Sequence, residues 1–120
     1  MSRDYRLYLD DMKTSCAKIR RYVGSMSFGE FLADEKTLDA VVRNLQIVGE
    51  AAGHIPEETT RKYSTVDWAG ITGFRNIVVH EYFGVDEEIL WDIITRHVPR
   101  LDEQLSDILA AEGTDSGQTA

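Results

Sequence analysis

The chain has 120 residues, of which 42% are hydrophobic and 28% charged, and this is typical of one globular domain with a single core. Its two prolines, nine glycines and single cysteine, Cys16, argue against collagen-like or disordered sequence and exclude an internal disulfide. No apolar stretch approaches the roughly 20 residues that span a bilayer, and the charged N-terminus is unlike a signal peptide. We therefore expect a cytoplasmic protein with no membrane partner.

The net charge of −8 at first argues against a nucleic-acid partner, and no DNA partner is expected, but the charge is unevenly distributed. Residues 86–120 hold nine acidic and two basic residues, a net of −7, whereas residues 1–85 carry only −1. The acidity therefore belongs to the C-terminal segment, and the nearly neutral charge of residues 1–85 weakens the objection to a nucleic-acid partner. Four basic residues near the N-terminus form either a solvated helix face or a binding surface: Lys13, Lys18, Arg20 and Arg21.

Apolar residues recur at intervals of three and four between Tyr5 and Met26, which predicts a first amphipathic helix with Asp4 as its N-cap. The sequence GSMSFGEF interrupts it. A second helix is expected from the N-cap Asp34 to Gly53, whose flexible backbone suits a helix end.

Residues 54–65 are expected to form a connection with one short helical turn after Pro56. A third helix is predicted from about Asp67 to about Tyr82, and Gly84 breaks it.

Asp86 is expected to cap a fourth helix that reaches Leu109 and is kinked by Pro99, which removes a backbone donor. The sequence shows no strand-like alternation and no internal repeat. We therefore predict one all-α domain, an antiparallel bundle over residues 1–110, followed by a polar, disordered tail over residues 111–120.

The stretch FRNIVVHEYFG, residues 74–84, places four polar side chains around an apolar run: Arg75, Asn76, His80 and Tyr82. In a regular helix Asn76 and His80 are neighbours, and Arg75 and Tyr82 share an adjacent strip. Arg75 and His80 diverge by about 140°, so they converge only if the arginine curls back or the helix loosens.

Arginine and histidine suit phosphate chemistry. Arg75 offers a charged fork for phosphate oxygens, and His80 can take or give a proton near neutral pH. Together they are a minimal set for cleaving RNA without a metal ion or other cofactor, and a symmetric dimer would supply a second histidine. The simpler alternative is that both residues only complement the dipole of a helix C-terminus.

Asn44 and Glu50 are polar residues within the apolar pattern of the second helix and are supporting candidates. Glu50 either orients Arg75 or His80 across the bundle or forms a surface ion pair. Its spacing of four from His54 does not match the paired Glu-x-x-His sequences of di-iron bundles, so we predict no metal site. His97 is expected to be an ordinary surface or interface residue, and Trp68 and Trp91 to anchor the core.

The sequence RNIVVHEY resembles the Arg-x4-His-x-Tyr motif of the HepT-like toxins, which belong to the HEPN superfamily of helical ribonucleases. Residues 41–52, VVRNLQIVGEAA, are similar to the second helix of that family, and residues 68–76, WAGITGFRN, to its approach to the motif. Residues 85–101, VDEEILWDIITRHVPRL, are similar to its final helix. The resemblance covers most of residues 5–108.

The resemblance implies a HEPN bundle of four or five helices that forms a homodimer and cleaves RNA as the toxin of a type VII toxin–antitoxin system. It also implies a partner of the MNT type, a nucleotidyltransferase antitoxin that silences the toxin by adding AMP to the motif tyrosine. Arg75 would bind the phosphate, His80 would be the acid–base residue, Asn76 a polar helper and Tyr82 the modified tyrosine. The rival interpretation is a non-catalytic HEPN subunit that binds or regulates the nucleotidyltransferase.

Overall fold

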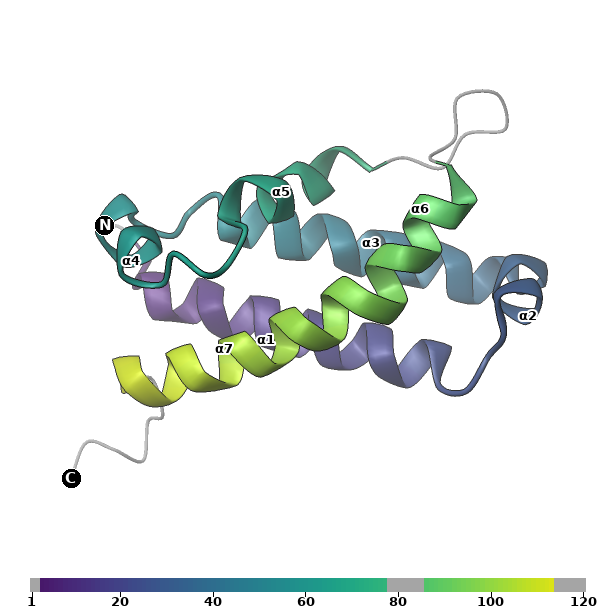
Figure 1. Ribbon diagram of the computed structural model, residues 1–120, viewed down its shortest axis with the longest axis horizontal. Helices are drawn as coiled ribbons and strands as arrows, with labels where there is room; N and C mark the ends of the chain where they lie inside the picture. Colours follow the sequence, from purple (N-terminus) through teal and green to yellow (C-terminus); the bar gives the residue numbers. More distant parts are fainter. Residues whose placement is uncertain (1–2, 78–85, 114–120) are drawn as a thin grey trace.

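The computed structural model describes residues 3–77 and 86–113, and within these ranges the chain is all-helical (Figure 1). The prediction of an all-α bundle is confirmed. None of the described helices is long and apolar enough to cross a membrane.

The long helices α1 (Tyr5–Val23) and α3 (Glu35–Ala52) run antiparallel and side by side, and α7 (Val98–Glu112) packs against α1 (Figure 1). Both predicted N-caps are present, because Asp4 accepts from the backbone N–H of Arg6 and Asp34 from that of Thr37. The buried side chains recur at the predicted helical spacing and include Leu9, Met12, Cys16, Ile19, Val41, Leu45, Val48, Leu101 and Leu105.

Two short helices occupy the connections. The sequence analysis missed α2 (Phe28–Ala33), although Ser27 and Glu30 form a capping box at its start. The helical turn expected after Pro56 is confirmed as α4 (Glu57–Lys62).

Trp91 packs against the core, with its ring centroid 5.3 Å from that of Phe31.

The last helix is continuous but irregular. It comprises α6 (Glu87–Asp92), the π-helical turn η2 (Ile93–His97) and α7, and its N-cap is Asp86 as predicted. The π-helical turn ends just before Pro99, whose missing N–H and bulky ring cannot fit a regular α-helical interior. The π-helical turn thus lies beside the proline at which a kink was predicted.

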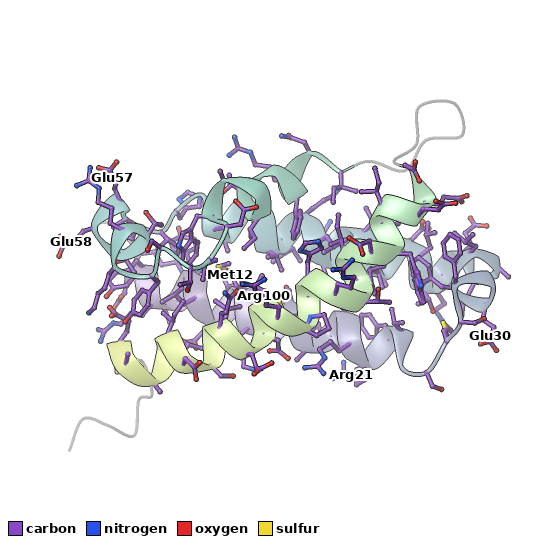
Figure 2. All side chains as sticks on the ribbon, viewed as in Figure 1. Met12, Arg21, Glu30, Glu57, Glu58 and Arg100 are labelled. Atoms are coloured by element: carbon purple, nitrogen blue, oxygen red, sulfur yellow. The ribbon has the colours of Figure 1, made fainter. Side chains whose placement is uncertain are left out.

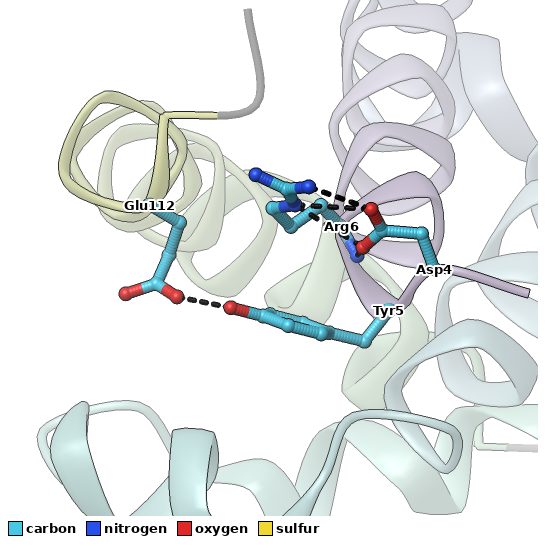
Figure 3. Close-up of polar contacts among 4 residues, drawn as sticks. All are labelled: Asp4, Tyr5, Arg6 and Glu112. Carbon is cyan, nitrogen blue, oxygen red and sulfur yellow. Dashed lines mark hydrogen bonds and ion pairs between the residues drawn. The ribbon is translucent and has the colours of Figure 1, made fainter.

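Helix α7 continues to Glu112, two residues into the segment predicted to be a disordered tail. The Glu112 carboxylate is almost fully buried and accepts a hydrogen bond from the Tyr5 hydroxyl (Figure 3). It also accepts one from the Tyr63 hydroxyl. It also pairs with the Lys62 ammonium at 3.0 Å. These contacts join the end of α7 to the start of α1 and to α4. Residues from 114 onward lie outside the described ranges.

The N-terminal basic cluster is partly neutralised inside the fold. Lys13 and Arg20 of α1 both pair with the buried Asp102 of α7, at 2.5 and 2.8 Å. Burial alone would raise the pKa of Asp102, but the hydrogen bonds from Lys13 and Arg20 outweigh it and lower that pKa. These two cations serve mainly to join the helices, which weakens the alternative of a binding surface there.

Candidate functional site

The predicted third helix ends earlier than expected. Asp67 caps α5 (Trp68–Thr72), which tightens into the 3-10 turn η1 (Gly73–Asn76), and Ile77 is already extended, with φ −68° and ψ 124°. A continuous helix through Ile77 to Tyr82 is therefore wrong. Two local causes favour this end. Ile77 is the first of three consecutive β-branched residues in the sequence, which are less favourable in a helix. The hydrogen bonds of a 3-10 helix are also poorly aligned, so such helices are short.

The Gln46 side chain of α3 fixes the point where the chain leaves η1. Its Nε2 donates to the Ile77 carbonyl at 2.5 Å, so that carbonyl has a partner outside its own helix. Ile77 itself is buried, with 9% of its surface exposed. The predicted neighbourhood of Asn76 and His80 assumed a helix through Ile77, so that spacing argument no longer applies. His80 and Tyr82 lie outside the described residues.

A glycine allows α3 and η1 to approach closely. A β-carbon at Gly49 would meet the backbone nitrogen of Arg75 and lie 2.9 Å from the carbonyl carbon of Phe74. It would also lie 3.0 Å from the carbonyl oxygen of Ile71. Because backbone atoms cannot yield as a flexible side chain can, only glycine fits here without displacing η1.

Arg75 is exposed and lines a groove of about 230 Å³ against α3. The α3 residues in that groove lie three, four and seven positions apart and so share one helix face: Arg43, Gln46, Ile47 and Glu50. Two arginines therefore border one groove. Neither Arg43 nor Arg75 has an ion pair with a carboxylate of the described residues, although seven of the chain's 13 lysines and arginines do.

The three supporting candidates are not all in this groove. Glu50 is in it, but its carboxylate pairs with His54 Nε2 at 3.4 Å, the surface ion pair that the sequence left open. Asn76 is exposed at the end of η1. Asn44 is buried, and its Nδ2 donates to the Ala40 carbonyl of its own helix at 2.9 Å, so it acts within α3.

Sequence reasoning missed Arg43, Gln46 and Gly49. The sequence feature that could have identified them is a polar residue at every third or fourth position on one face of the second helix, with a glycine beside that face. The Gly49-x3-Gly53 spacing also marks a face without side chains, and a β-carbon at Gly53 would lie 3.6 Å from an Arg75 guanidinium nitrogen. The partner of this face could not be read from local sequence.

Comparisons with known proteins show which family the chain resembles. A family model described as ribonuclease HepT-like matches residues 12–108. A protein of Methanocaldococcus jannaschii named as a putative RNase is 38% identical over 114 residues, which cover 94% of each chain. The probable ribonuclease HepT of Thermococcus cleftensis is 35% identical over 101 residues, 84% of this chain and 92% of the relative. No solved structure matches the chain significantly.

Proposed function

The chain belongs to the ribonuclease HepT-like family, and from this premise we propose that it is a metal-independent endoribonuclease centred on Arg75. The observation that carries the proposal is the exposure of the Arg75 guanidinium and its lack of a carboxylate partner among the described residues. It is exposed beside Arg43 in a groove, without a carboxylate partner among residues 3–77 and 86–113, in a chain whose net charge is −8. A phosphodiester would satisfy it through two parallel hydrogen bonds.

In the proposed reaction, the ribose 2′-oxygen attacks the adjacent phosphorus while the bond to the 5′-oxygen breaks. Arg75 stabilises the negative charge that grows on the phosphate oxygens. His80 accepts the 2′-hydroxyl proton, and a second acid protonates the leaving 5′-oxygen. The products are a 2′,3′-cyclic phosphate and a free 5′-hydroxyl.

Arg43 and Gln46 have separate roles in this proposal. Arg43, on the α3 wall of the groove, adds a second cation for the phosphate backbone. Gln46 is a positioning residue, because its hydrogen bond to Ile77 holds the start of the segment that leads to His80. Gly49 lets α3 approach closely enough for both contacts.

We further propose that the active form is a homodimer, so that one protomer's His80 supplies the base and its partner supplies the acid. Silencing would come from a nucleotidyltransferase antitoxin of the MNT type, with which the dimer could assemble into a larger hetero-complex. The Tyr82 hydroxyl would attack the α-phosphorus of ATP, releasing pyrophosphate and a proton and leaving AMP on the tyrosine. The added phosphate would then occupy the Arg75 anion site.

Analysis of the cleavage products tests the activity. Purified wild-type chain, incubated with RNA in excess chelator, should give fragments with 2′,3′-cyclic phosphate ends. His80→Ala should give none while circular dichroism still shows the wild-type helical content. Products with 3′-hydroxyl ends would refute this chemistry. An inactive wild type that still binds a nucleotidyltransferase would favour the non-catalytic subunit.

The silencing switch needs its own experiment. After incubation with a family nucleotidyltransferase, ATP and magnesium, mass spectrometry should place AMP on Tyr82. Tyr82→Phe should keep its ribonuclease activity and resist silencing. If Tyr82→Phe is silenced as readily as the wild type, the switch lies on another residue.

A further inference from the structure

A second groove, of about 350 Å³, opens between α5–η1 and the η2–α7 segment. Phe74 lines it, whereas the next residue, Arg75, lines the groove against α3. Successive residues of a 3-10 helix point about 120° apart, so η1 separates the two grooves and contributes one side chain to each. The volume is within the range of about 300–1,000 Å³ that holds small organic ligands.

This groove is lined by both apolar and basic side chains. Its apolar residues include Ile71, Phe74, Ile93 and Leu101, and Arg100 and His97 provide the basic groups. Among the described residues that line it, only Asp67 has a carboxylate, which accepts from the Gly70 backbone N–H at 3.1 Å as the cap of α5.

Arg100 is the most informative residue here. It is exposed on α7 (Figure 2). None of the ion pairs among the described residues involves it. Its neighbour Arg96 pairs with Asp92 at 3.4 Å, and His97 lies 3.3 Å from the same carboxylate. In a chain with 21 acidic and 13 basic residues, an unpaired arginine beside an apolar surface is suited to an external anion that carries an apolar group.

We propose that this groove is a nucleotide subsite for single-stranded RNA, in which a base packs on Phe74 and Ile93 and Arg100 holds a phosphate. Every base has a flat face that stacks on an aromatic ring, and guanidinium binds phosphate through paired hydrogen bonds. Because Phe74 and Arg75 are consecutive on η1, one strand can cross η1 and reach both grooves. The proposal rests on the proposed ribonuclease function for the identity of its ligand.

Binding to RNA that cannot be cleaved tests this subsite separately from catalysis. The probe is a fluorescent oligoribonucleotide of about ten nucleotides, fully 2′-O-methylated, and the readout is anisotropy at several salt concentrations. Arg100→Ala should raise Kd about tenfold and reduce the slope of log K against log salt by about 0.7, the loss of one single-strand phosphate contact. Phe74→Leu should raise Kd without changing the slope.

Arg96→Ala is the matched control, because it removes one positive charge from the same helix outside the groove. It should leave both Kd and the salt slope unchanged, and Arg100→Lys should keep the slope. Equal effects of Arg96→Ala and Arg100→Ala would overturn the subsite, as would a wild type that does not bind the probe. A change in oligomeric state for Arg100→Ala, seen by light scattering with unchanged RNA binding, would assign the groove to a protein interface instead.

The two proposals fail in different ways. If unmodified RNA is cut normally and Arg100→Ala binds the probe like the wild type, the subsite is wrong and the ribonuclease remains. If the wild type binds the methylated probe through Arg100 but leaves unmodified RNA intact, the groove binds RNA and the catalytic assignment is wrong.

Discussion

Single side chains fix the point where the chain leaves η1 toward His80, and Gln46 is the clearest example. Its hydrogen bond to Ile77 fixes the end of η1. Gln46→Ala should lower the free energy of unfolding by about 1 kcal/mol and lower kcat for RNA more than it weakens RNA binding. Steady-state kinetics and urea unfolding measure both effects.

Thr95→Val is a suitable control, because it also removes a side-chain bond to a backbone carbonyl, that of Trp91 at 2.8 Å, but outside both grooves. It should leave kcat unchanged. If Gln46→Ala lowers RNA affinity and leaves kcat intact, Gln46 is a binding residue and not a positioning residue.

Glu112 gives the fold a defined dependence on pH. Hydrogen bonds from Tyr5, Tyr63 and Lys62 lower the pKa of Glu112 from 4.5 to about 2. Because the folded pKa is the lower one, this stabilisation is complete above about pH 5 and is lost as the pH falls toward 2. Glu112→Gln should therefore destabilise the protein clearly at pH 7 and much less near pH 2.

Chemical unfolding of wild type and Glu112→Gln across this pH range measures the difference. Glu103→Gln, an exposed carboxylate on the same helix, is the control and should have little effect at any pH. A destabilisation by Glu112→Gln that does not change between pH 7 and pH 2 would contradict the assigned role of the carboxylate.

Among the elements, the contact between α3 and η1 brings together the residues of the proposed site. Gly49→Ala would place a methyl group against the backbone of Arg75 and Phe74, so η1 must move. We expect a destabilisation of about 1–3 kcal/mol and a loss of RNA cleavage under conditions where the variant remains folded. Thermal unfolding and cleavage assays at a temperature well below Tm measure the two effects.

Gly29→Ala provides the matched control, because a β-carbon at this position of α2 meets nothing within 4 Å. It should be neutral or stabilising by up to about 1 kcal/mol, as alanine is the better helix former. If Gly49→Ala is as well tolerated as Gly29→Ala, the close approach of α3 to η1 does not constrain the site.

The same elements show what local sequence can and cannot predict. Helices α1 and α3 were predicted with their caps because periodicity and capping are local properties, as was the disturbance at Pro99. The early end of the third helix was not predicted, because the local causes named above act together with a partner 31 residues away, Gln46, which donates to the Ile77 carbonyl. Arg75 was singled out by its chemistry, whereas its neighbours Arg43 and Gln46 emerged only when α3 and η1 were placed together.

At the scale of the whole molecule, arginines border both grooves beside η1, although Arg21 on α1 also has no ion pair among the described residues. Of the three arginines that line the two grooves, Arg43, Arg75 and Arg100, none has a described carboxylate partner, while Asp102 neutralises two cations of α1. A negatively charged surface with a local cationic site disfavours non-specific binding of nucleic acid along the molecule. RNA binding should therefore depend on these arginines.

Assembly also belongs to this scale. Each chain supplies one motif histidine, so the proposed acid–base pair needs two chains. Light scattering at micromolar concentration should give twice the mass of the 13.6 kDa chain. When an excess of the inactive His80→Ala variant is mixed with wild type, mixed dimers should form, and their ribonuclease activity should be lower than that of the wild-type dimer. Full cleavage by a species shown to be monomeric would contradict the shared site.

The most direct test of the central claim is the rate of RNA cleavage by Arg75→Ala in excess chelator, compared with wild type and with Arg61→Ala. Arg61 is an exposed arginine of α4 paired with Glu57, outside both grooves, and its loss should change nothing. Removing one donor to the developing phosphate charge should slow cleavage by about 100-fold or more. Cleavage by Arg75→Ala at the wild-type rate, or loss of wild-type cleavage on adding chelator, would contradict a metal-independent ribonuclease built on Arg75.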